Sequence, residues 1–118
     1  MGDPLTIAVR TERGHTIATV AGEIDISTVT LLCERLFELA SSSHQLVIDL
    51  DQVTFIDATG LDTLVAAANR TEAHGGRLHV VCARAKILNL FRLAGLDRRL
   101  PPVPTLDEAL ATSGRQPC

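Results

Sequence analysis

Alternating apolar and polar residues near the start of the chain predict a β-hairpin. In the segment 5–10, LTIAVR, large aliphatic residues occupy every second position, which is the period of a strand with one buried face. The pair Arg13-Gly14 marks a turn, and the segment 16–22, TIATVAG, is predicted to form the second strand. Because the connection is short, the two strands are expected to pair antiparallel.

Apolar residues at helical spacing predict three helices further along the chain. The helices are expected at about 27–40, at about 59–74 and within the segment 83–96, because in each segment the apolar residues recur three or four positions apart. The stripes expected to face the core are Val29, Leu32, Cys33, Leu36, Phe37 and Ala40 in the first helix, Leu61, Leu64, Val65 and Ala68 in the second, and Ile87, Leu90, Phe91 and Ala94 in the third.

Capping residues mark where the helices begin and end. Ser27 or Asp25 can cap the first helix by accepting hydrogen bonds from its free amides. Gly75 and Gly95 are placed to end the second and third helices, Gly75 as a left-handed C-terminal cap. The segment 105–108, TLDE, has the pattern of a capping box and predicts a short last helix.

Two further strands are predicted between the helices. The segments 45–50 and 77–82 hold runs of consecutive aliphatic residues, which are typical of strands covered by helices on both faces. The prolines of the segment 100–104, LPPVP, allow an edge or broken strand at most. Strands that alternate with helices are expected to be parallel. The predicted fold class is therefore α/β, with a mixed sheet, an N-terminal antiparallel hairpin, later parallel strands and about four helices.

Length and composition fit a single domain. The chain has 118 residues, and one domain over residues 1–118 is expected, with its core at about 5–110 and a flexible tail at 113–118. Three Phe residues with no Tyr or Trp leave few rings on which bases could stack. The net charge is −3 and the basic residues are scattered, so nucleic-acid binding is not expected.

The expected location is the cytoplasm, with reduced cysteines. The N-terminal segment lacks the apolar core of a signal peptide, and the sequence has no uninterrupted apolar run of the roughly 20 residues that span a membrane. The three cysteines share no CxxC spacing. Cys33 and Cys82 are expected to be reduced core residues, with a redox role as the alternative, and Cys118 to be an exposed thiol.

The segment 55–60, FIDATG, holds the strongest candidate for chemistry. It joins a strand to a helix, and such junctions in α/β sheets gather ligands. The free amides of the helix start could bind a phosphate, with Gly60 allowing close approach, although Asp57 would repel an anion. Asp57 is also an ordinary helix cap, and the residues alone favour this interpretation.

Catalytic and metal-binding alternatives have less support in the sequence. Asp25 and Asp57 could pair as carboxylates, but no pattern indicates a substrate cleft. The four histidines lie in predicted turns or on a strand, without the spacing of a metal site. The sequence contains neither GxxxxGK[ST] nor GxGxxG. No catalytic residue, metal site or cofactor is therefore predicted.

Three segments together resemble a known family. GEIDIST at 22–28, VTFIDATGL at 53–61 and ARAKILNLFRLAGL at 83–96, in this order of elements, are similar to the STAS domain and in particular to bacterial stand-alone anti-sigma factor antagonists. The resemblance covers about residues 5–110. It implies a binding protein that is not an enzyme: it would bind an anti-sigma factor with a GHKL-type ATP-binding fold and thereby release a sigma factor.

The sequence departs from this family at one position that matters. In the family, the anti-sigma factor phosphorylates a serine directly after the aspartate of D-S-[ST]-G, whereas this chain has Ala58 there. Thr59 has the nearest hydroxyl and is a possible phosphate acceptor. Its expected role is instead to cap the helix, with its hydroxyl oxygen accepting a hydrogen bond from a backbone amide and Asp62 completing a capping-box-like pair. Without the serine, the domain is expected to stay competent to bind its partner.

The expected partner-binding residues lie at one edge of the sheet. They are Asp25, Asp57, Ala58, Thr59, Gly60, Leu61 and Asp62, joined by Thr63 and Ala66 on the exposed face of the second helix. Two other functions stay open: a STAS subunit of a membrane lipid-transport or anion-transport complex, and a nucleotide-sensing or small-molecule-sensing domain. The oligomeric state is expected to be a monomer or a weak dimer.

Overall fold

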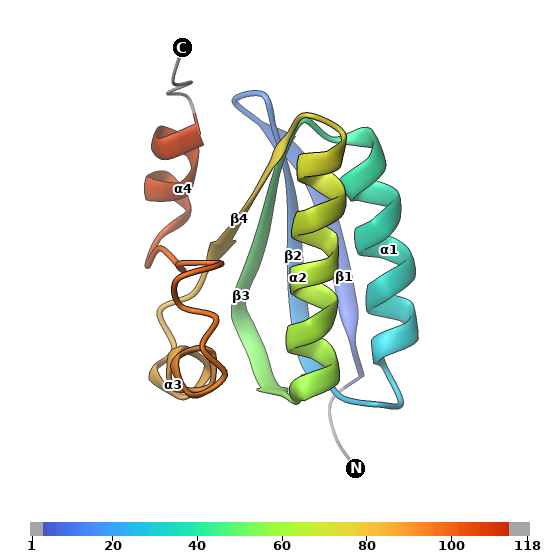
Figure 1. The fold of residues 1–118 in the computed structure, drawn as a ribbon, viewed down its shortest axis with the longest axis vertical. Helices are drawn as coiled ribbons and strands as arrows, with labels where there is room; N and C mark the ends of the chain where they lie inside the picture. Colours follow the sequence, from blue (N-terminus) through green and yellow to red (C-terminus); the bar gives the residue numbers. More distant parts are fainter. Residues whose placement is uncertain (1–3, 114–118) are drawn as a thin grey trace.

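A computed structural model describes residues 4–113. These residues form one sheet and four helices (Figure 1). In chain order the elements are β1 (Thr6–Glu12), β2 (His15–Ile24), α1 (Val29–Ser42), β3 (Gln45–Ile56), α2 (Ala58–Ala73), β4 (Arg77–Val81), α3 (Ala85–Leu93) and α4 (Leu106–Ser113). The predicted flexible tail and the exposed thiol of Cys118 lie outside the described residues, apart from Ser113 at the end of α4.

The sheet has the predicted mixed topology. Its strand order is β1-β2-β3-β4, with β1 antiparallel to β2 and the later neighbours parallel. Strand β3 continues to Ile56, six residues beyond the predicted end at Leu50. The register between β2 and β3 shifts twice, which lets the polar segment after Leu50 stay paired. The α/β fold class is thus confirmed, but the prediction that this strand ends at 50 was wrong.

Helices cover both faces of the sheet, as the consecutive aliphatic residues of β3 predicted. On one face, Leu46 and Ile48 belong to the larger core cluster with residues of α1 and α2. On the other face, Val47 packs in a smaller cluster with Ala109 and Leu110 of α4. Figure 1 shows α1 and α2 together on one side of the sheet and α4 on the other.

The apolar stripes are mostly buried, with several corrections. In α1, Leu32 and Leu36 are fully buried, whereas Val29, Cys33 and Phe37 are only half-buried. In α3, Ile87 and Phe91 are fully buried, Leu90 is half-buried, and Ala94, just after the helix, is exposed. Phe37 and Leu90 are packed against the larger core cluster without being fully enclosed by it.

Helix ends agree with the prediction more closely at the C-terminus than at the N-terminus. Gly75 and Gly95 have left-handed φ angles of 82° and 73°, as expected of residues that follow a helix. Helix α1 begins at Val29 with Thr28 as its N-cap, so the predicted start at Ser27 and the cap by Ser27 or Asp25 were wrong. Helix α2 begins one residue before the predicted Thr59.

The proline-containing segment 100–104 makes a single bridge to the sheet. Val103 pairs in parallel with Val81, its amide donating to the carbonyl of Val80 at 2.9 Å and its carbonyl accepting from Cys82 at 2.9 Å. This is the broken edge strand that the prolines predicted. Thr105 then caps α4, because its hydroxyl oxygen accepts from the amide of Glu108 at 3.2 Å.

Candidate functional site

Asp57 caps α2 and organises the strand-to-helix junction. One carboxylate oxygen, Oδ1, accepts from the amide of Gly60 at 3.1 Å and from the hydroxyl of Thr59 at 2.6 Å. The cap interpretation of Asp57 is therefore confirmed. The predicted role of Thr59 was wrong: its hydroxyl donates to Asp57 and accepts no amide, because Asp57 already occupies the N-cap position. The expected pairing of Thr59 with Asp62 is correspondingly absent from the described hydrogen bonds.

Asp25 forms a second acidic turn beside this junction. Its Oδ1 accepts from the amide of Ser27 at 2.9 Å and from the Ser27 hydroxyl at 2.6 Å. These two hydrogen bonds lower the pKa of Asp25, the side-chain bond contributing most. Asp25 is thus held as a carboxylate within its own turn.

The two acidic turns are held together through the backbone. The amide of Asp57 donates to the carbonyl of Ile24 at 3.1 Å, so the segment after β3 is fixed to the end of β2. The prediction that Asp25 and the loop 57–61 share one edge of the sheet is confirmed. Figure 1 shows the end of β2, the end of β3 and the start of α2 at the same end of the molecule.

The exposed part of this end differs from the predicted set. Ala58 and Asp62 are exposed, but Gly60 and Leu61 are buried beneath them. Thr63, expected on the exposed face of the helix, is buried at 9% exposure on the side that faces α1, and its hydroxyl donates to the carbonyl of Thr59 at 2.9 Å. Ala66 is half-buried. Only Ala58 and Asp62 of α2 therefore remain as exposed candidates among those predicted.

Two exposed apolar side chains extend the site and were missed. Ile26 is 79% exposed in the turn after Asp25, and Phe55 is 39% exposed next to the last residue of β3. One exposed apolar residue thus accompanies each acidic turn, so this end of the sheet presents apolar as well as charged surface. The alternation of Phe55 with buried Ile56 at the strand end was the available signal.

A groove between α1 and α2 adjoins the same end. Its volume is about 360 Å³, and it is lined by Val29, Thr30, Cys33 and Glu34 of α1 and by Thr59, Asp62 and Thr63 of α2. Cys33 and Cys82 are both free thiols, as predicted, but Cys33 lines this groove instead of the core. Burial raises the pKa of the Cys82 thiol. This favours the protonated thiol over the thiolate, which is the reactive form of cysteine.

Metal ligands do not gather in the part of the chain that the structure describes. Over residues 4–113, no three His, Cys, Asp or Glu side chains lie close enough to hold an ion. Within the same residues, no helix has the length and apolar character needed to cross a membrane. The arrangement of the junction is thus that of a surface with two oriented carboxylates and exposed apolar side chains.

Comparison with known proteins identifies the family. The STAS domain model matches residues 6–109, so the chain belongs to the STAS domain family. The anti-sigma-B factor antagonist of Bacillus subtilis is 29% identical over 92 residues, which are 78% of this chain and 84% of that protein. The crystal structure of an anti-sigma factor antagonist from Mycobacterium paratuberculosis is 31% identical, covers 94% of this chain and 95% of that one, and superposes with a TM-score of 0.87.

The same fold also occurs inside a transporter. The murine Solute Carrier 26 family member A9 anion transporter matches with a TM-score of 0.75 and 18% identity, over 89% of this chain and 18% of that one. At this identity the likeness concerns the fold alone. Fold alone therefore does not separate antagonists from transporter domains.

Proposed function

We propose that this protein is an anti-sigma factor antagonist, which binds an anti-sigma factor and so releases a sigma factor. The observation that carries the proposal is the likeness to an anti-sigma factor antagonist structure over 94% of this chain and 95% of that one, at 31% identity. The anti-sigma-B factor antagonist of Bacillus subtilis supports it over 78% of this chain. We infer a binding protein of the cytoplasm and assign it no enzymatic activity.

The proposed docking surface is the end of the sheet where the two acidic turns meet. Asp25 and Asp57 are oriented there by their own hydrogen bonds. Ile26 and Phe55 supply apolar area, and Asp62 adds an exposed charge one turn along α2. Preformed charges around apolar anchors favour binding, because little side-chain entropy remains to be lost. The proposed partner has a GHKL-type ATP-binding fold.

We further propose that the usual phosphorylation switch is missing. Ala58 is exposed as the first residue of α2, where a hydroxyl would be accessible, but a methyl group cannot accept a phosphoryl group. Thr59 is half-buried and its hydroxyl is bound to Asp57. An oxygen held in this way is poorly placed for in-line attack on a phosphate. The protein would then be a constitutive antagonist, or one controlled by other means.

Affinity capture from cells followed by calorimetry tests the proposal. The captured protein is expected to be a GHKL-type ATP-binding protein. Asp62→Arg should weaken this complex at least tenfold without changing the melting temperature by more than a few degrees, because Asp62 is exposed. Asp97→Arg, the same charge reversal at an exposed position in the segment after α3, is the matched control and is expected to bind like the parent.

Other outcomes would contradict the proposal in distinct ways. Capture of an ABC transporter subunit would favour the transport-complex function. Micromolar binding of a nucleotide in the absence of protein partners would favour a sensor. Unchanged affinity of Asp62→Arg for the GHKL-type protein would leave the antagonist function intact but would show that the docking surface lies elsewhere.

A further inference from the structure

The outer edge of β4 is only partly paired. Val103 bonds to the carbonyl of Val80 and the amide of Cys82, which places the backbone groups of even-numbered residues on the outer side of the strand. The amide and carbonyl of Leu78 and the amide of Val80 therefore point the same way. Among residues 4–113 these three groups have no backbone partner on that side. Buried backbone amides and carbonyls normally have a hydrogen-bond partner, and Val80 is only 2% exposed.

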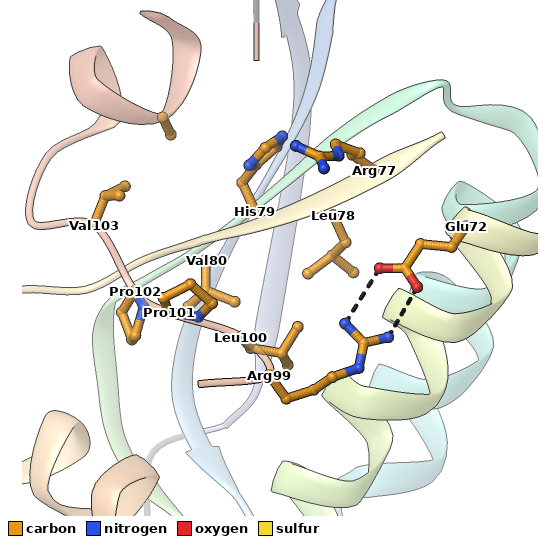
Figure 2. Close-up of a pocket in the computed structure, with 11 residues that line it drawn as sticks. Glu72, Arg77, Leu78, His79, Val80, Arg99, Leu100, Pro101, Pro102 and Val103 are labelled. Atoms are coloured by element: carbon orange, nitrogen blue, oxygen red, sulfur yellow. Dashed lines mark hydrogen bonds and ion pairs between the residues drawn. The ribbon is translucent and has the colours of Figure 1, made fainter. Parts of the chain in front are cut away.

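A cavity lies along this unpaired stretch. Its volume is about 400 Å³, and its walls are the strand itself, the segment 99–103 and Ala109 of α4. Figure 2 shows Arg77 and His79 on one side of β4, and Leu78 and Val80 on the other side with the segment that leads to Val103. The cavity thus has two elements of a peptide site, a partly unpaired backbone edge and side chains from both faces of β4 in its walls (Figure 2).

The side chains around the cavity favour a negatively charged occupant. The guanidinium of Arg77 is exposed and has no hydrogen bond or ion pair with any residue from 4 to 113. Glu72, the acidic residue of the lining, is already neutralised by Arg99, whose Nη2 and Nη1 donate to its carboxylate at 3.0 and 3.2 Å (Figure 2). Arg77 therefore remains as an unpaired cation at the cavity, with His79 beside it.

We propose that the open half of the β4 edge, from Arg77 to Val80, binds an acidic, extended peptide segment of a partner protein by strand addition. The peptide backbone would donate to the Leu78 carbonyl and accept from the Leu78 or Val80 amide. One of its carboxylates would pair with Arg77. This site begins at the opposite end of the parallel strands from the acidic turns, so the proposal stands independently of the antagonist function.

The other edge of the sheet shows why β4 is the better candidate. Strand β1 also has one unpaired side, but most of its residues are exposed, and Arg10 is already paired with Glu12 at 3.4 Å. A solvated edge gains little from exchanging water for a peptide backbone. The Val80 amide, in contrast, belongs to a buried residue and gains a partner on binding.

Selection from a random heptapeptide library against the full chain tests the proposal. Enriched peptides are expected to contain Asp or Glu. They should protect the amide of half-buried Leu78, which is expected to exchange readily in the free protein, and should slow exchange of the buried Val80 amide further. Arg77→Gln should weaken binding of an enriched peptide about tenfold, the loss expected for one charge-assisted contact. Arg10→Gln on β1 is the matched control and should bind like the parent.

Two further measurements separate strand addition from simpler explanations. Two versions of the enriched peptide can be made, one N-methylated at its odd-numbered residues and one at its even-numbered residues. Only one version should lose binding, because in an added strand only every second amide faces β4. Sodium acetate or inorganic phosphate alone should leave the exchange of the Leu78 and Val80 amides unchanged. Protection by either ion equal to that by the peptide would reduce the site to an anion site.

The proposal would be overturned by three other results. Peptides that affect residues 57–62 instead of 77–80 would place peptide binding at the acidic turns. Protection of the Leu78 amide in the free, dilute protein would show that the chain itself already covers the edge. Protection that increases with protein concentration alone would indicate a second copy of the chain as the occupant. The second and third results do not bear on binding of an anti-sigma factor.

Discussion

Gly60 in the first turn of α2 lies directly against Ile24 at the end of β2. A Cβ atom at residue 60 would lie 2.5 Å from Cγ2 of Ile24 and 2.7 Å from Cγ1 of Ile56, closer than carbon atoms can approach. Both isoleucines are almost completely buried, so neither can move aside without disturbing the core. The absence of a side chain at residue 60 is what lets the helix start rest on the two strand ends.

Gly60→Ala is therefore expected to lower the free energy of unfolding by about 1–3 kcal/mol, the usual cost of overpacking. In an exposed helical position the same change would raise it by up to about 1 kcal/mol. Urea unfolding of Gly60→Ala measures the first effect. Comparing Asp62→Gly with Asp62→Ala, at an exposed position of the same helix, measures the second. A stabilised Gly60→Ala protein would show that α2 can shift away from Ile24.

Ala58→Ser is expected to restore the phosphorylation switch. Incubated with ATP and the captured anti-sigma factor, the variant should gain one phosphate and then lose affinity for that partner, because a phosphoryl group adds about 1.5–2 negative charges beside Asp57. The parent protein should keep its mass. Intact-mass measurement and calorimetry before and after incubation provide both readouts.

The Asp57–Thr59 hydrogen bond defines the result that contradicts this expectation. A carboxylate 2.6 Å from a hydroxyl can also act as a base toward it. Phosphate mapped to Thr59 in the parent would therefore show that the bond activates Thr59, and the constitutive interpretation would be wrong. Thr59→Val is the control, since it keeps the shape of the side chain without the hydroxyl.

Phe91→Ala is expected to lower the free energy of unfolding by about 3–5 kcal/mol. Phe91 is fully buried in the larger core cluster, and the two other Phe residues lie elsewhere and do not fill the space. Phe55→Ala removes the same side chain from an exposed position and should change stability by less than about 1 kcal/mol. On the proposed function it should instead weaken the anti-sigma factor complex. Similar urea midpoints for the two variants would contradict the assignment of Phe91 to the core.

The stability of the protein is expected to fall at acidic pH partly through His79. Burial lowers the pKa of this histidine, and Arg77 and His15 lower it further. The unfolded chain therefore binds a proton at this histidine more readily than the folded protein does. The contribution of neutral His79 to the free energy of unfolding is complete above about pH 6.5, and it is lost as the pH falls from there toward the folded-state pKa. Nε2 of His79 lies 3.3 Å from Oε1 of Gln45, and it can donate to this oxygen in either charge state.

His79→Gln tests this dependence because glutamine cannot titrate and can still bond to Gln45. Urea unfolding between pH 5 and pH 8 should show the parent losing more stability on acidification than the variant. Exposed His44→Gln is the matched control for loss of an imidazole. Parallel pH curves for the parent and His79→Gln would mean that His79 takes up its proton equally well in both states.

Local patterns in the sequence were sufficient where one segment determines its own structure. The hairpin follows from alternation and a two-residue turn, and the caps by Asp57 and Gly75 follow from residue type and position. The acidic loops were correctly placed at one edge, because the direction of parallel strands fixes where their ends meet. These features need little information from distant parts of the chain.

Features that depend on distant residues were not predictable in the same way. Strand β3 continues past Asp51 because two register shifts keep it paired with β2, and because the Asp51 carboxylate accepts from the distant amide of Ala83 at 2.7 Å. The start of α1 is displaced because the Thr28 hydroxyl bonds to the carbonyl of Glu23 at 2.9 Å. The direction of the Thr59 hydroxyl depended on which of two neighbouring residues became the cap.

The parallel course of β2, β3 and β4 separates the acidic turns from the open edge of β4. The turns lie where the strands end, and the open edge starts where β4 begins (Figure 1). A partner held at one of these places leaves the other accessible. A protein bound through the β4 edge would thus be held close to a second protein bound at the acidic turns. Each would be present at a high effective concentration near the other, which favours contact between them.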